Sequence, residues 1–248
     1  MVPLAGNVIP AYCACEGSLK LAMKTPSNIS LRSDRRRRFA VKEVYVTLQG
    51  EGFRAGVPAV FCRFTGCNLW SGLERDKSTS VCWFCDTDFM ATDGVGGGIF
   101  EGAECLASHI QQVWTQNEVE ESPYVVFTGG EPMLQLDEDL VEQCHKLGFE
   151  VGIETNGTLA VPDCVDWITV SPKAHSKLVQ TRGNELKIVW PQPTLSPQDF
   201  EDLEFDAFYL QPMDGSNLEE NIEITSTYCE RYPRWSLSLQ KHKLLGLP

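Results

Sequence analysis

The chain has no long hydrophobic run. Its 248 residues contain no stretch of eighteen or more apolar residues, the length that a membrane-spanning helix requires. The first positions, Met1 to Gly6, also lack the basic region and apolar core of a secretory signal. We therefore expect a cytoplasmic protein that has no membrane partner.

Basic residues are scarce. Lysine and arginine together number 21 against 34 aspartates and glutamates, which gives a net charge of −13. The first forty positions hold seven basic and two acidic residues, or +5, so the remainder carries −18. Such an acidic body repels phosphate backbones, which argues against a nucleic-acid partner and favours a small-molecule substrate.

The N-terminal segment lacks a sustained apolar period. Residues 1–39 end in a Ser/Asn/Arg-rich run with four consecutive arginines, Arg35 to Arg38. That composition is typical of a disordered extension. We expect such an extension over residues 1–39, followed by a single catalytic domain over residues 40–248.

Three of the ten cysteines form a spaced array. The ten are scattered over a large chain, unlike the disulfide framework of a small secreted protein. Cys67, Cys82 and Cys85 have the spacing Cys-x14-Cys-x2-Cys, and no histidine lies between Ser71 and Phe100 to complete a zinc site. Three thiolates on an iron–sulfur cluster leave one iron open to a small molecule. The spacing favours a cluster, with zinc and buried thiols as alternatives.

Apolar, β-branched runs alternate with segments of helical period. After a strand predicted over residues 41–46, core strands are expected over residues 59–64, 124–127, 151–153, 167–170, 186–190 and 208–210. Helices are expected over residues 103–114, 136–147 and 217–228. The alternation predicts an α/β fold, an incomplete TIM-like barrel of about six parallel strands with helices outside.

Polar motifs marked by glycine or proline follow nearly every predicted strand. Only the strand over residues 186–190 lacks one. Ligands of parallel α/β folds bind at the carboxyl ends of the strands, so these motifs should converge on one composite site.

Two of these motifs have chemistry that the residues alone suggest. Gly129 and Gly130 permit close backbone approach, so the N–H groups of their turn could hold a ligand, or the segment is a plain βα turn. Gln49 and Glu51 could read the edge of a heterocycle while Arg63 binds a carboxylate, and a surface turn with a surface ion pair is the alternative.

Hard oxygen ligands stand beside the thiols. The segment Asp86-Thr87-Asp88 follows Cys85 directly. Such oxygens suit Mg²⁺, and helix capping is the competing interpretation.

Together the motifs resemble the radical S-adenosylmethionine superfamily and, within it, the 7-carboxy-7-deazaguanine synthase family of queuosine-type deazapurine biosynthesis. The resemblance covers residues 41–248. The first cysteine gap is eleven residues longer than the usual Cys-x3-Cys-x2-Cys, a departure that a long-loop subset of the family shares. The matching segments are residues 48–52, 62–64, 66–70, 82–88, 128–132, 154–157, 171–173, 211–214 and 237–243.

The resemblance implies a lyase. A [4Fe–4S] cluster on the three cysteines would bind S-adenosylmethionine at its open iron, and one-electron cleavage would give a 5′-deoxyadenosyl radical. That radical would take a hydrogen from C6 of 6-carboxy-5,6,7,8-tetrahydropterin, whose ring then contracts and loses ammonia to give 7-carboxy-7-deazaguanine.

The resemblance also assigns residues by their match to the family pattern. The implied contacts of S-adenosylmethionine are Phe84, Cys85, Asp86, Gly130, Ser171, Pro172, Lys173, Gln211, Pro212, Met213 and Asp214. The implied contacts of the pterin are Leu48, Gln49, Gly50, Arg63, Thr128 and the terminal carboxylate of Pro248. Thr87 would bind Mg²⁺.

The family further implies a flavodoxin-type electron donor and a homodimer. Two alternative functions fit the thiol array. One is a radical activase that acts on a partner protein, and the other is a non-enzymatic protein that holds a metal through cysteine.

Overall fold

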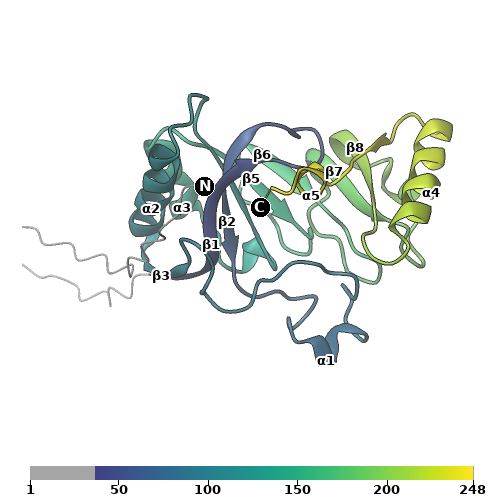
Figure 1. The fold of residues 1–248 in the computed structure, drawn as a ribbon, viewed down its shortest axis with the longest axis horizontal. Coiled ribbons are helices and arrows are strands. Elements are labelled where there is room, and N and C mark those ends of the chain that lie inside the picture. The colour runs from purple at the N-terminus through teal and green to yellow at the C-terminus, as the bar shows by residue number, and fades with distance from the viewer. Residues whose placement is uncertain (1–36, 248) are drawn as a thin grey trace, which may run out of the picture.

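The described part of the chain, residues 37–247 of a computed structural model, forms one large, mostly parallel sheet with helices packed against it (Figure 1). The strand order is β3-β1-β2-β4-β5-β6-β7-β8-β9. β1 runs antiparallel to β2 and β3, and the other neighbouring pairs are parallel. The strands are β1 (Arg38–Leu48), β2 (Pro58–Phe64), β3 (Gly98–Glu101), β4 (Tyr124–Gly129), β5 (Glu150–Thr155), β6 (Trp167–Val170), β7 (Arg182–Trp190), β8 (Glu204–Pro212) and β9 (Ser236–Leu237).

The longer helices are amphipathic. On α2, the buried residues Ala103, Leu106, Ala107 and Ile110 recur at the spacing of one helical face. The carboxylate of Asp137 caps α3 by accepting from the Leu140 amide at 3.0 Å. The helices are α1 (Glu74–Lys77), α2 (Ala103–Gln116), α3 (Glu138–Lys146), α4 (Leu218–Arg231) and α5 (Lys241–Leu245), with short 3₁₀ turns η1 (Pro132–Leu134) and η2 (Pro197–Phe200).

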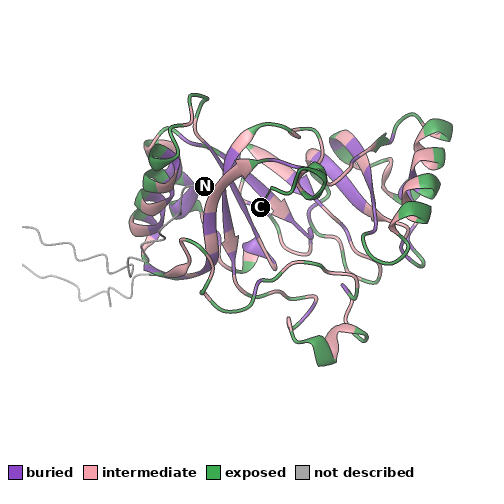
Figure 2. Cartoon of the chain, viewed as in Figure 1, coloured by how far each residue is buried: buried purple, intermediate pink, exposed green. Residues whose placement is uncertain are grey.

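From β2 onward, each new parallel strand joins the sheet beside the one before it. Right-handed crossovers between strands added in one direction place the connecting helices on the same face of the sheet. Apolar side chains of α2 and α3 share one buried cluster with β1, β2, β4 and β5, and a second cluster joins α4 to β7 and β8 (Figure 2). The opposite face carries a smaller apolar cluster of Ala59, Phe61, Tyr124 and Val126, together with polar residues.

Strand alternation separates these two faces. On β7, Leu186 and Ile188 are fully buried in the apolar core, whereas Lys187 between them lines a cavity on the other side. On β2, Cys62 belongs to the apolar core and Arg63 lines the same cavity. Cys62 is therefore a core residue and does not face the cavity.

The six predicted core strands and three predicted helices are present, so the α/β class is confirmed. One boundary differs from the prediction. β1 begins at Arg38, and Phe39 is fully buried, so these two positions of the predicted extension belong to the sheet. Residues 1–36 lie outside the described residues. None of the helices in residues 37–247 is long and apolar enough to cross a membrane.

Candidate active site

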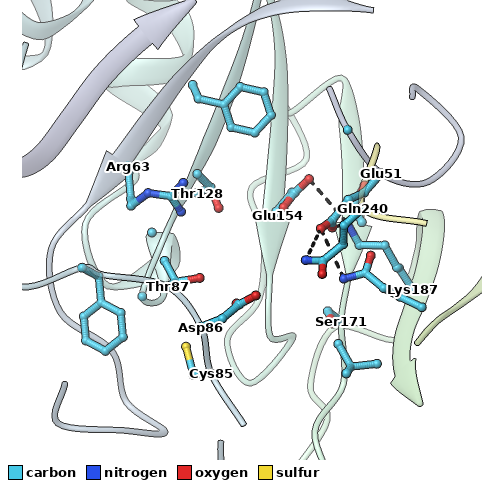
Figure 3. Close-up of a pocket in the computed structure, with 18 of the residues that line it drawn as sticks. Glu51, Arg63, Cys85, Asp86, Thr87, Thr128, Glu154, Ser171, Lys187 and Gln240 are labelled. Atoms are coloured by element: carbon cyan, nitrogen blue, oxygen red, sulfur yellow. Dashed lines mark hydrogen bonds and ion pairs between the residues drawn. The ribbon is translucent and has the colours of Figure 1, made fainter. Parts of the chain in front are cut away.

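A cavity of about 440 Å³ is formed where the parallel strands end (Figure 3). Its lining comes from β1 and the turn after it, from the carboxyl ends of β2, β4, β5, β6, β7 and β8, from the loop that holds the three cysteines and from the segment around α5. The predicted site residues that line it are Leu48, Gln49, Gly50, Arg63, Cys67, Cys82, Phe84, Cys85, Asp86, Thr87, Thr128, Gly130, Ser171, Lys173, Gln211, Pro212 and Asp214.

Three predicted residues are not among these. Pro172 and Met213 are buried and do not line the cavity, although their neighbours Ser171, Lys173 and Asp214 do. Successive side chains of an extended segment point to opposite sides, which explains the difference. Pro248 lies outside the described residues, so its carboxylate contact stays a prediction.

The thiols of Cys67, Cys82 and Cys85 all face this cavity. Cys82 and Cys85 are joined in a tight turn, in which the Cys85 amide donates to the Cys82 carbonyl at 3.1 Å. The Cys82 thiol also donates to Cys85, which lowers the pKa of Cys85 to about 6 and raises the pKa of Cys82. The ammonium of Lys173 lies near both sulfurs and favours their thiolate forms.

The donor set fits a cluster better than a single ion. Within residues 37–247, no three His, Cys, Asp or Glu side chains converge closely enough to hold one metal ion. In an iron–sulfur cluster each thiolate binds its own iron, so the three sulfurs need not meet at one point. The three cavity-facing thiols satisfy that weaker requirement.

An aromatic contact organises the long loop between Cys67 and Cys82. The Trp70 ring packs edge-on against Phe89 with centroids 5.4 Å apart, and its indole N–H donates to the Leu73 carbonyl at 3.2 Å. Lys77 of α1 lies over the same indole, 5.2 Å from its centroid. These contacts fold the insertion beside the cavity, so its length does not carry Cys67 away from the other two thiols.

The turn after β4 packs directly on the Cys67 loop. A Cβ atom added at Gly130 would lie 2.1 Å from the Gly66 carbonyl oxygen and 2.8 Å from Cys67 Cβ. The Glu131 amide donates to the same Gly66 carbonyl at 2.9 Å. Only glycine allows this approach at position 130.

Glu131 connects the ends of β4 and β5. Its buried carboxylate accepts from the Met133 amide at 3.0 Å, from the Thr155 hydroxyl at 2.7 Å and from the Asn156 amide at 2.8 Å. Burial raises the pKa of Glu131. The turn is therefore more than a plain βα connection, because its carboxyl fixes two neighbouring strand ends.

Arg63 occupies one end of the cavity, with Thr128 and Thr87 on the same side in Figure 3. Its guanidinium donates through Nε to Glu43 at 2.8 Å and through Nη2 to the Tyr45 hydroxyl at 3.2 Å. The Arg63 side chain is only 17% exposed, so this is not the surface ion pair considered as an alternative.

The two aspartates of the segment after Cys85 have different partners. Asp88 pairs with Lys42 at 2.8 Å and accepts from the Met90 amide at 3.0 Å, so it stabilises the loop. Asp86 pairs with Lys243 of α5. Thr87 lies between them on the cavity wall.

The opposite end of the cavity holds a buried ion-pair cluster that includes Lys187, Glu51 and Glu154 (Figure 3). Lys187 Nζ lies 2.6 Å from Glu51 and 3.6 Å from Glu154. Burial alone would raise the pKa of Glu51, but Lys187 and a hydrogen bond from Gln240 lower it to about 2. The Gln49 amide donates to Glu154 at 2.8 Å.

The segment around α5 forms the last wall. The Lys241 amide donates to the Gly50 carbonyl at 2.9 Å, and the His242 ring packs against the Gly50 backbone. Lys243 forms ion pairs with Asp86 after Cys85 and with Asp214 after β8. One short helix thus contacts three separate cavity segments.

Sequence reasoning assigned no site role to several cavity residues. The charged ones are Lys42, Glu43, Glu154, Lys187 and Lys243. A signal for Lys187 was present, because a charged residue alternates with Leu186 and Ile188 inside an otherwise apolar strand.

The chain is similar to proteins of one activity. It is 54% identical over 209 residues to the 7-carboxy-7-deazaguanine synthase of Bradyrhizobium diazoefficiens, and the aligned region covers 84% of this chain and 99% of that protein. With the synthase of Nitratidesulfovibrio vulgaris it shares 52% identity over 214 residues, covering 85% of this chain and 99% of the relative.

A solved structure agrees. The fold is similar to the crystal structure of QueE from Escherichia coli, with a TM-score of 0.59 and 26% identity over 83% of this chain and 95% of that chain. No protein-family model matches the chain. At this level of identity and coverage, the chain belongs to the 7-carboxy-7-deazaguanine synthase family of radical S-adenosylmethionine enzymes.

Proposed function

We propose that this chain converts 6-carboxy-5,6,7,8-tetrahydropterin into 7-carboxy-7-deazaguanine, with loss of ammonia, in queuosine biosynthesis. The supporting observation is one cavity that joins the three thiols to Arg63 at one end and to Glu51 at the other. A cation for a carboxylate and acceptors for an N–H-rich ring edge suit the two ends of this pterin. The names of relatives at 52–54% identity support the same reaction.

Cys67, Cys82 and Cys85 would hold the [4Fe–4S] cluster. When bound, the cluster and S-adenosylmethionine supply the one-electron chemistry that starts the ring contraction. The donor set fits, since the three cysteines line one cavity and Lys173 favours the thiolate forms of Cys82 and Cys85.

The remaining assigned residues bind and orient. S-adenosylmethionine would lie against Phe84, Asp86, Gly130 and the segments that follow β6 and β8, where Pro172 and Met213 support their neighbours from behind. Leu48 to Gly50, Arg63, Thr128 and Pro248 would hold the pterin, and Thr87 would bind Mg²⁺ beside the pterin carboxylate. A fixed, water-poor cavity would keep the reacting atoms aligned.

Several wider assignments belong to the same proposal. The sheet would curve as an incomplete TIM-like barrel, in line with its sequential parallel strand order. Residues 40–248 would be the catalytic domain, working as a cytoplasmic homodimer that takes electrons from a flavodoxin-type donor.

Anaerobic turnover tests the function. Protein reconstituted with iron and sulfide receives S-adenosylmethionine, Mg²⁺, a chemical reductant and the carboxytetrahydropterin, and products are identified by mass spectrometry. We expect 7-carboxy-7-deazaguanine, and no product from Cys67→Ala. The control is Cys105→Ala, a thiol of α2 outside the cavity.

The alternatives give other results. An activase would cleave S-adenosylmethionine and form no deazaguanine, which would overturn the proposal. A non-enzymatic metal protein would show no reducible visible absorption band.

A further inference from the structure

Lys187 is a buried cation among three carboxyl groups. It extends from β7 toward the cavity with its side chain 6% exposed. Glu51 reaches it from the turn after β1, Glu154 from β5 and Glu185 from β7 itself. The titratable and charged groups that also lie near this cluster are His242 of α5, beside Glu51, Lys173 after β6, and Arg54 of the turn after β1, which lines a small neighbouring cavity with Glu51, Glu154 and Glu185.

Two amide side chains take their orientation from Glu51. Gln240 Nε2 donates to Glu51 Oε1 at 2.9 Å, and Gln211 Nε2 donates to the same oxygen at 3.2 Å. An ionised carboxylate only accepts hydrogen bonds, so both amides must turn their N–H groups toward it. Gln49 makes the equivalent contact with Glu154.

This orientation leaves an acceptor for a ligand. Gln211 lines the cavity, and its carbonyl oxygen Oε1 is buried without a hydrogen-bond partner among residues 37–247. A buried polar atom without a partner is unfavourable, and a bound donor would satisfy it.

We infer that Lys187 is a positioning residue that sets the hydrogen-bond polarity of this end of the cavity. By pairing with Glu51 and Glu154, it keeps both as hydrogen-bond acceptors, so that Gln240 and Gln211 donate to Glu51 and Gln49 donates to Glu154. The cavity then accepts hydrogen bonds from the amino group and adjacent ring N–H of the pterin. The inference rests on the proposed function.

Charge balance supports this role. Without Lys187, burial would favour the protonated form of Glu51, which donates a hydrogen bond. Glu51 could then turn its O–H toward a substrate edge that itself carries N–H groups. Both sides would be donors, and binding would weaken.

The first test is Lys187→Met in reconstituted holoenzyme. We expect the KM for the carboxytetrahydropterin to rise by about tenfold or more, the effect of losing a charge-assisted contact. The KM for S-adenosylmethionine is measured as well, because Gln211, an implied contact of that cofactor, donates to Glu51 at 3.2 Å. We expect a smaller increase for the cofactor than for the pterin, and a larger one would overturn the inference. Lys146→Met, an exposed lysine of α3, is the matched control.

A pH profile separates positioning from a structural role. Pterin affinity of the wild type should be flat between about pH 6 and 9, since Glu51 stays ionised. In Lys187→Met the affinity should increase as the pH rises, because Glu51 regains its charge. An unchanged KM, or a flat profile in a folded variant, would overturn the inference.

Two further variants keep the test decisive if Lys187→Met does not fold. Lys187→Arg retains the charge and should keep a flat pH profile, and a steep profile in that variant would count against the inference. Glu51→Gln/Lys187→Met removes both charges, and its loss of affinity should be smaller than the product of the two single losses. If the loss in the double variant equals the product of the two single losses, Lys187 and Glu51 act independently and the inference is wrong.

Failure of the inference differs from failure of the proposed function. If the wild type forms deazaguanine while Lys187 variants bind the pterin normally, only the role of Lys187 is wrong. If the wild type forms no deazaguanine, the function itself is wrong.

Discussion

Arg63 is held in place before any substrate arrives. Glu43 and the Tyr45 hydroxyl take two of its donors, which fixes the plane of the guanidinium and leaves its remaining N–H groups for a ligand. A carboxylate bound there would gain a bidentate contact without the cost of ordering a free arginine.

Arg63→Ala should therefore raise the KM for the carboxytetrahydropterin by about tenfold or more, the effect of losing a charge-assisted pair. The visible spectrum of the cluster should not change, since Arg63 holds no thiol. Steady-state kinetics and absorption spectra measure the two effects. Arg182→Ala, which breaks an exposed pair with Asp163, is the control. Wild-type turnover by Arg63→Ala would remove its carboxylate role.

Glu51 links stability to pH. Its pKa falls from 4.5 to about 2 in the folded chain, so its ionisation stabilises the native state above about pH 4.5. That contribution is lost as the pH falls toward 2. Glu51→Gln should lower the free energy of unfolding at pH 7 by up to about 3 kcal/mol, the equivalent of this shift.

Denaturant unfolding at several pH values measures this effect. The stability difference between wild type and Glu51→Gln should shrink between about pH 4.5 and 2, because the wild-type carboxyl also becomes neutral there. A difference that stays constant over this range would show that Glu51 does not stabilise through its charge.

Single residues differed in how well the sequence revealed them. The three cysteines were identified from spacing, and Arg63 from the chemistry of its guanidinium and from the resemblance to the family. Lys187 and Glu154 had no assigned role, because one charged position in an apolar strand does not reveal which partners the fold brings to it. Gln240 and His242 reach the cavity from α5, at a distance in sequence that no local pattern encodes.

At the scale of elements, the turn between β4 and η1 couples the sheet to the thiol loop. Its contact with Gly66 depends on the absence of a side chain at Gly130. A methyl group there would meet backbone, which has little freedom to move aside.

Gly130→Ala should destabilise the protein by about 1–3 kcal/mol, the usual cost of overpacking. It should also reduce the iron bound after reconstitution, because the Cys67 loop must shift. Thermal unfolding and iron analysis measure these effects. Gly98→Ala on β3 is the control, since its Cβ would lie no closer than 3.7 Å to a neighbour. Normal iron content in Gly130→Ala would contradict the coupling.

Periodicity identified the long elements and missed the short ones. The six parallel strands each contain an apolar, β-branched run, and the helices α2, α3 and α4 are long enough for their period to repeat. β3 has only two apolar residues, Ile99 and Phe100, and β9 is two residues long, so neither has a recognisable pattern. The antiparallel direction of β1 is set by its pairing with β2 and β3, which the sequence of β1 alone does not encode.

At the scale of the whole molecule, Lys243 connects both sides of the cavity through Asp86 and Asp214. Lys243→Met should release α5 from these loops. We expect KM increases of about threefold to tenfold for both S-adenosylmethionine and the pterin, together with faster proteolysis near residue 243.

Limited proteolysis and kinetics with each ligand varied in turn measure this release. Lys241→Met is the control, because Lys241 holds Gly50 through its backbone amide and its side chain is exposed. If α5 is as resistant to protease in Lys243→Met as in the wild type, the two ion pairs do not hold it.

The hydrogen bond between Lys241 and Gly50 has a consequence for the synthesis of the chain on the ribosome. The turn that follows the first strand leaves the ribosome long before α5, so a growing chain carries an open wall during nearly all of its synthesis. A nascent polypeptide could bury its core and gather its sulfur ligands, yet it would not enclose a pterin until translation had passed α5. A chain that ended before α5 would thus have a cavity that lacks one wall and stays open to solvent.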